Sequence, residues 1–126
     1  MLLARLPDGR FLVGLPGSPT AALAGLQVRV VRGGPVMDAD ALRAAFRPYS
    51  VHAPRASVVC AENTHNGAGG MVTPLPRLRA IQEVAATQGM PRHLDGARLW
   101  NAHVATGTPL ADFAACAATV MVSFSK

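Results

Sequence analysis

Three short segments of the chain combine side chains that could bind and activate a small charged ligand. They are residues 62–66 (Glu-Asn-Thr-His-Asn), Asp95 with Arg98, and residues 125–126 (Ser-Lys). Each lies at the end of a predicted strand, and together they supply carboxylates, two cations and hydrogen-bonding groups. Open parallel sheets bind ligands beyond the carboxyl ends of their strands. The pattern therefore predicts a site at one sheet edge, although polar residues follow strands in most proteins.

The elements that must position these segments alternate between strands and helices. Strands are predicted over residues 27–31, 57–61, 92–94 and 119–124, and a short strand is considered over 10–13. Asp38 predicts the start of one helix, and Thr73 as N-cap with Pro74 at the first helical position predicts another that ends at Gly89. Two shorter helices are expected over about 99–104 and 112–117. This order predicts an α/β fold with a mainly parallel sheet.

Four motifs, in order and spacing, resemble one enzyme family. They are residues 62–66, the glycines at 69 and 70, residues 93–98 (His-Leu-Asp-Gly-Ala-Arg) and residues 125–126. Together they resemble threonine aldolases of the aromatic amino acid β-eliminating lyase and threonine aldolase family. Residues 22–27 and 52–55 also match the family pattern. The resemblance implies part of the three-layer, mainly parallel-sheet large domain of the aspartate-aminotransferase-like (fold type I) enzymes, with pyridoxal 5'-phosphate as cofactor.

The resemblance also implies roles for four residues, each with a simpler alternative. Asp95 would stabilise the protonated pyridine nitrogen of the cofactor, or it would only cap the following helix. Lys126 would be the catalytic Schiff-base lysine, or a solvated lysine. Arg98 would bind the substrate carboxylate, or lie on a helix surface. His52 would act as catalytic base near the substrate hydroxyl, or be a loop histidine. His65 and His93 are expected to have structural roles, and His103 to lie on a helix surface.

The implied reaction is the retro-aldol cleavage of threonine, or of a similar β-hydroxy-α-amino acid, to glycine and an aldehyde. The same residue types would also serve another β-eliminating lyase, and an inactive remnant or interaction fragment of this fold is a further alternative. The implied partner is a small amino acid substrate. A homo-oligomer for the complete enzyme and a cytoplasmic location are expected.

The similarity begins inside the family's large domain. We therefore expect an internal fragment: residues 1–20 form a poorly defined, non-matching N-terminus, and residues 21–126 form a partial cofactor-binding domain that is truncated before and after. The family's phosphate-binding loop and its ring-stacking histidine are not found in the sequence. The isolated chain is accordingly expected to fold poorly and to have little activity.

Composition argues against several other classes of protein. The net charge is +5, but the eleven arginines are scattered and aromatic residues make up only 5%, which disfavours a nucleic-acid-binding module. No run of 18 apolar residues predicts a membrane span. The histidines and cysteines lack metal-ligand spacing, so no metal site is predicted. Cys60 and Cys116 are expected to be buried thiols rather than a disulfide.

Overall fold

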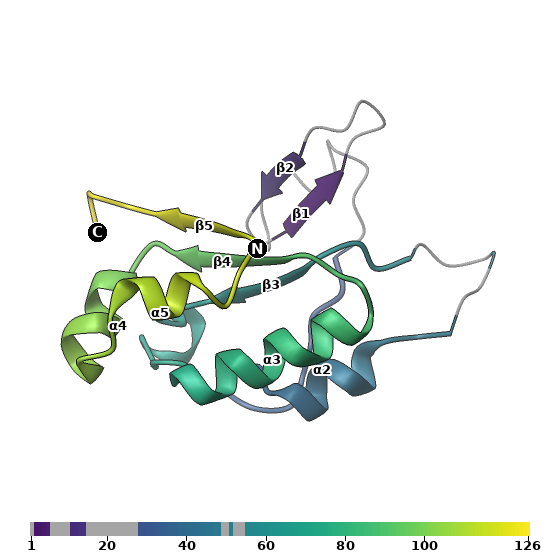
Figure 1. Cartoon of the computed structure of the whole chain (residues 1–126), viewed down its shortest axis with the longest axis horizontal. Coiled ribbons are helices and arrows are strands. Elements are labelled where there is room, and N and C mark those ends of the chain that lie inside the picture. The colour runs from purple at the N-terminus through teal and green to yellow at the C-terminus, as the bar shows by residue number, and fades with distance from the viewer. Residues whose placement is uncertain (1, 6–10, 15–27, 49–50, 52–54) are drawn as a thin grey trace.

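The computed structural model describes residues 2–5, 11–14, 28–48, 51 and 55–126. Its central feature is a three-stranded parallel sheet with helices packed against one face (Figure 1). The strands are β3 (Val59–Glu62), β4 (Arg92–Gly96) and β5 (Thr119–Val122), in the order β3-β4-β5. All three strands point the same way, so their carboxyl ends share one edge. The predicted α/β fold class is confirmed.

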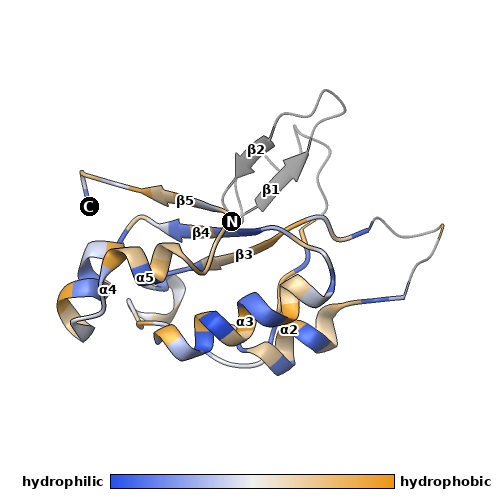
Figure 2. Ribbon diagram, viewed as in Figure 1, coloured by the Kyte–Doolittle hydropathy of each residue, from blue (hydrophilic) through white to orange (hydrophobic). Residues whose placement is uncertain are grey.

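The two faces of the sheet differ because side chains alternate along each strand. Ala61, Leu94 and Val120 are paired across the three strands, and all three belong to or pack against one hydrophobic cluster. His93 and Asp95 are neighbours of Leu94 along β4 and therefore point to the opposite face. Both are buried although they are polar, and β4 is the most hydrophilic strand of the sheet in Figure 2. The central strand thus presents chemically capable side chains away from the helices.

The longest helix, α3 (Leu75–Thr87), joins two parts of the core. Leu78 packs with Leu94 on β4 and with Phe113. Ile81, one turn further on, belongs to a second cluster that includes Leu42. These apolar residues are three or four positions apart, so they form one helix face. The prediction that Gly89 follows the end of this helix is confirmed, since Gly89 has a φ of 64° directly after the C-cap Gln88.

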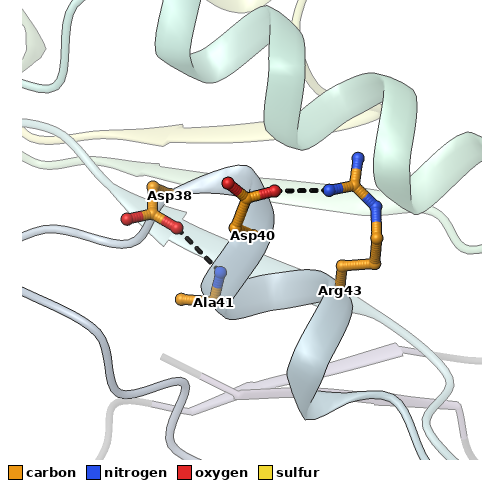
Figure 3. Close-up of polar contacts among 4 residues, drawn as sticks. All are labelled: Asp38, Asp40, Ala41 and Arg43. Atoms are coloured by element: carbon orange, nitrogen blue, oxygen red, sulfur yellow. Dashed lines mark hydrogen bonds and ion pairs between the residues drawn. The ribbon is translucent and has the colours of Figure 1, made fainter.

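A short helix, α2 (Ala39–Ala45), packs beside α3. Its predicted N-cap is confirmed: an oxygen of Asp38 accepts a hydrogen bond of 2.7 Å from the main-chain N–H of Ala41 (Figure 3). Asp40 and Arg43 form an exposed ion pair on the same helix. Exposed pairs of this kind contribute little to stability, so burial of Leu42 is the stronger anchor of α2.

The helices that follow β4 complete the layer beneath the sheet. They are α4 (Leu99–Thr106) and α5 (Leu110–Ala114). Leu99 and Phe113 are almost completely buried in the cluster that contains Leu94. A 3-10 turn, η1 (Asn66–Ala68), lies between β3 and α3. An antiparallel pair is formed by β1 (Leu2–Arg5) and β2 (Phe11–Gly14) (Figure 1).

Several predicted boundaries are wrong. Residues 28–31 form no strand, while Gln27 lies outside the described residues. The strand expected over 57–61 begins only at Val59, and β1 was not expected. Pro74, rather than Thr73, is the N-cap of α3, because the main chain of Thr73 is hydrogen-bonded to the side chain of Asn63. Cys116 is buried as expected, but Cys60 is only half buried because it lies on the sheet face away from the helices.

Candidate active site

Asp95 is the best-defined member of the candidate site. It lies near the carboxyl end of β4, only 3% exposed, and an oxygen of its carboxylate accepts a hydrogen bond of 3.0 Å from the N–H of Ala97. Arg98, and not Asp95, occupies the N-cap position of α4. Asp95 therefore closes a turn just before that helix instead of capping it.

The environment of this carboxylate is unusual because no cationic side chain among the described residues pairs with it. Within residues 28–48, 51 and 55–126, no arginine or lysine forms an ion pair with Asp95. Burying a carboxylate without a cationic partner is costly, and proteins usually provide a partner or use the group functionally. His93, two positions before Asp95 on β4, is also buried, and its electrostatic interaction with Asp95 acts to raise the histidine pKa.

His93 has a structural contact, as predicted. Its Nδ1 lies 2.7 Å from the hydroxyl oxygen of Thr119 on β5. Its Nε2 is buried and has no hydrogen-bond partner in the described part of the chain. Burial lowers the pKa of His93 from its ordinary value, and this effect outweighs the opposing influence of Asp95. A neutral ring at this position is therefore favoured.

Arg98 and Lys126 both follow strands that end at the same sheet edge as Asp95. Arg98 follows Asp95 by three residues and is half buried. Lys126 is exposed and lies four residues beyond the end of β5, whose carboxyl end is beside that of β4 (Figure 1). The rings of Trp100 and Phe124 are 6.1 Å apart, so the segment before Lys126 lies near the start of α4.

These three residues are not bonded to one another. No hydrogen bond or ion pair between described residues joins Asp95, Arg98 and Lys126. Neither Arg98 nor Lys126 makes a side-chain hydrogen bond or an ion pair with the described residues. His52 lies outside the described residues, and its predicted role is untested.

The remaining histidines have local contacts. Nδ1 of His65 accepts a hydrogen bond of 3.1 Å from the N–H of Ala68, which confirms its structural role in the loop after β3. Nδ1 of His103 lies 2.7 Å from the carbonyl oxygen of Thr108, so this half-buried ring fastens the end of α4. The expectation of a simple surface histidine was wrong, because the chain turns back over His103 after Gly107.

Sequence reasoning missed two features of this edge. The contact between Trp100 and Phe124 joins residues 24 positions apart, and no local pattern indicates it. The side chain of Asn63 is fully buried, whereas an asparagine after a strand is usually interpreted as a loop residue. A polar residue directly following a short apolar run was the only available signal.

The described residues provide neither a metal-binding cluster nor a membrane span. No group of three or more His, Cys, Asp or Glu side chains in the described chain could hold a metal ion. Likewise, none of the described helices is long and apolar enough to cross a membrane.

Comparison with known proteins gives a consistent result. The model of the beta-eliminating lyase family matches residues 17–126. Low-specificity L-threonine aldolase 1 of Arabidopsis thaliana is 37% identical over 92 residues, which are 71% of this chain and 26% of that protein. An alanine racemase of Cochliobolus carbonum is 44% identical over 77 residues, which are 60% of this chain and 19% of the racemase.

A solved structure extends this result to the fold. The crystal structure of a putative L-allo-threonine aldolase from Listeria monocytogenes superposes with a TM-score of 0.70 at 26% identity. The match covers 86% of this chain and 28% of the Listeria chain. The chain spans about a quarter of the length of the curated relatives that it matches first.

Proposed function

Because this chain belongs to the beta-eliminating lyase family, we propose that it contributes part of a pyridoxal-phosphate site that cleaves threonine or a similar β-hydroxy-α-amino acid to glycine and an aldehyde. One observation carries the proposal: Asp95 is a buried carboxylate, near the carboxyl end of the central strand, without a cationic side-chain partner in the described chain. A protonated pyridine ring would supply the missing positive charge. The similarity to threonine aldolases supports the choice of reaction.

Two of the residues present fit this cofactor. Asp95 would hold the proton on the ring nitrogen, because a carboxylate in a poorly solvated position interacts strongly with a neighbouring cation. Lys126 would bind the cofactor through its amine. Bound in this way, pyridoxal phosphate supplies an electron sink for the carbon–carbon bond cleavage.

Arg98 and His52 would act on the substrate. The guanidinium of Arg98 has the planar donor geometry that binds a carboxylate through two hydrogen bonds, so it would fix the orientation of the amino acid. A neutral His52 ring would take the proton from the substrate hydroxyl, since an imidazole titrates close to neutral pH. We also propose that the complete protein works as a homo-oligomer.

The proposal is tested by assaying the chain with pyridoxal phosphate and threonine, with acetaldehyde as the measured product. We expect Arg98→Lys to raise KM for threonine about tenfold or more, because one ammonium cannot replace a bidentate guanidinium. The matched control is Arg77→Lys, which changes an exposed arginine on α3 and should leave KM unchanged. Equal effects of the two substitutions would contradict the role of Arg98.

A second candidate reaction is the racemisation of alanine. It is favoured by the 44% identity to the protein named as an alanine racemase. Racemisation also needs Asp95 and Lys126, but it breaks a Cα–H bond and needs no group to deprotonate a hydroxyl. Conversion of L-alanine to D-alanine, without release of acetaldehyde from threonine, would favour racemisation. No product from threonine, alanine or aromatic amino acids would favour a fragment without activity of its own.

A further inference from the structure

The side chain of Asn63 makes a closed contact with a single distant residue. It is 0% exposed and directly follows β3. Its Nδ2 donates a hydrogen bond of 3.2 Å to the carbonyl oxygen of Thr73, and its Oδ1 accepts one of 3.0 Å from the N–H of Thr73. Thr73 is itself only 4% exposed and directly precedes the N-cap of α3. Asn63 therefore fastens the end of β3 to the start of α3.

The main chain of Asn63 makes a third contact, to the central strand. Its N–H donates a hydrogen bond of 2.9 Å to the carbonyl oxygen of Asp95. This bond continues the ladder in which Glu62 is paired with Asp95. One residue thus joins β3, β4 and α3 at the carboxyl edge of the sheet. Among these contacts, only those to Thr73 depend on the identity of the side chain.

The loop that this contact closes is tightly bonded inside. The N–H of His65 donates to the carbonyl oxygen of Met71 over 2.8 Å, and the N–H of Gly70 donates to the carbonyl oxygen of His65 over 2.9 Å. The contact between Asn63 and Thr73 lies at the base of this loop. These bonds and the contact between Asn63 and Thr73 together link the two ends of the loop.

We propose that Asn63 is a positioning residue, whose amide holds the loop between β3 and α3 against β4 and thereby fixes Asp95 at the cofactor site. The inference deepens the proposed function and rests on it for the role of Asp95. An amide suits this position because it offers one donor and one acceptor side by side, and both are needed by the buried main chain of Thr73. Buried main-chain groups in proteins are nearly always paired, and an unpaired one is costly.

The main test uses Asn63→Asp, which keeps the shape of the side chain. In this variant a carboxylate oxygen can still accept the hydrogen bond from the N–H of Thr73. The Nδ2 donor, however, is replaced by a second oxygen, which faces the carbonyl oxygen of Thr73. Asn63→Ser is a milder second variant that serves if the first does not fold. The matched control is Gln82→Leu. It removes a different side-chain amide hydrogen bond, which Gln82 on α3 donates to the carbonyl oxygen of Ala115.

The readout is amide hydrogen exchange, measured residue by residue by NMR on the full chain. The amide of Ala97 reports on Asp95, because it donates to the Asp95 carboxylate. We expect Ala97 to exchange at least about tenfold faster in Asn63→Asp, the change that corresponds to losing the support of one hydrogen bond. In Asn63→Asp, the amide of Leu42 in α2, which donates to the carbonyl oxygen of Asp38, should keep its exchange rate. In Gln82→Leu, the amide of Ala97 should keep its exchange rate.

Two results would overturn the inference. One is faster exchange at Thr73 without any change at Ala97, which would limit Asn63 to holding the loop. The other is equal acceleration at Ala97 and Leu42, which would reveal only a loss of global stability. Equilibrium dialysis with pyridoxal phosphate separates the two proposals. If the unsubstituted chain binds it, Asn63→Asp should bind about tenfold more weakly. If the unsubstituted chain does not bind it, the proposed function fails, and exchange at Ala97 alone decides whether Asn63 positions Asp95.

Discussion

Gly96 is the residue whose substitution should most directly disturb the edge that carries Asp95. A Cβ atom at this position would lie 2.7 Å from the carbonyl oxygen of Met121 on β5, and 3.2 Å and 3.3 Å from the Cβ and Cδ2 atoms of Leu99. The nearest obstacle is main chain inside a paired strand, so it cannot rotate away. Gly96→Ala must therefore push β5 or α4 away from β4.

The expected cost follows from this crowding. Forcing additional carbon atoms into a packed interior typically costs about 1–3 kcal/mol. Because the closest contact is with a strand carbonyl and Leu99 is almost fully buried, we expect about 2 kcal/mol for Gly96→Ala. In a domain of this size, that corresponds to a decrease in Tm of about 8 °C. Urea unfolding followed by circular dichroism measures the loss of free energy of unfolding, and thermal unfolding measures the decrease in Tm.

Gly89 provides a control with a different physical cause. It has a φ of 64°, and a Cβ atom there would meet nothing within 4 Å. Gly89→Ala should cost about 1–2 kcal/mol from backbone strain, and Gly89→Asn should cost less because asparagine tolerates this conformation. At Gly96 the order reverses, since asparagine is larger than alanine. A cost below about 0.5 kcal/mol for Gly96→Ala, the usual range of harmless substitutions, would refute the steric reasoning.

Two further predictions concern pH and helix capping. Burial holds the pKa of His93 below its ordinary value of 6.5, so the unfolded chain binds this proton more readily than the folded chain; stability should fall as the pH drops below about 6.5. Urea midpoints at pH 7.5 and 5.5 measure this loss of stability, and the loss should be smaller in His93→Gln. An unchanged loss in that variant would contradict the attribution of the pH dependence to His93. Asp38→Ala should cost about 1 kcal/mol, because it removes the hydrogen bond to the N–H of Ala41. Asp38→Asn should retain most of that stability in thermal unfolding, and a loss as large as that of the alanine variant would argue against capping.

The sequence predicted those elements whose signals are local. The cap at Asp38, the glycine after α3 and the apolar run before Glu62 each act within a few residues, and each led to an element of the expected type. The strand expected over residues 27–31 failed for the opposite reason. Its alternating pattern indicates an extended segment, but a strand also requires a partner, and pairing is a long-range property that residues 28–31 lack.

The candidate site was predictable in its residue types and less so in its geometry. Asp95 and Arg98 could be singled out because they belong to a short motif at the end of a predicted strand. The sheet order then brings the carboxyl ends of β4 and β5 to one edge. The burial of Asp95 could not be predicted, because it depends on the neighbouring strands and on the turn to Ala97. The contact between Asn63 and Thr73 spans ten residues of loop, and no repeating pattern indicates such a pair.

Reductive trapping of pyridoxal phosphate tests the central claim most directly. Lys126 is the only lysine in the chain, so borohydride reduction followed by peptide mass spectrometry can assign the modified amine, with the N-terminal amine as internal reference. We predict saturable labelling of Lys126 that is at least about tenfold weaker in Asp95→Asn, since that variant no longer provides a negative charge for the ring nitrogen. Labelling of Lys126 that only matches the N-terminal amine, or that is unaffected by Asp95→Asn, would contradict a shared site for Asp95 and Lys126.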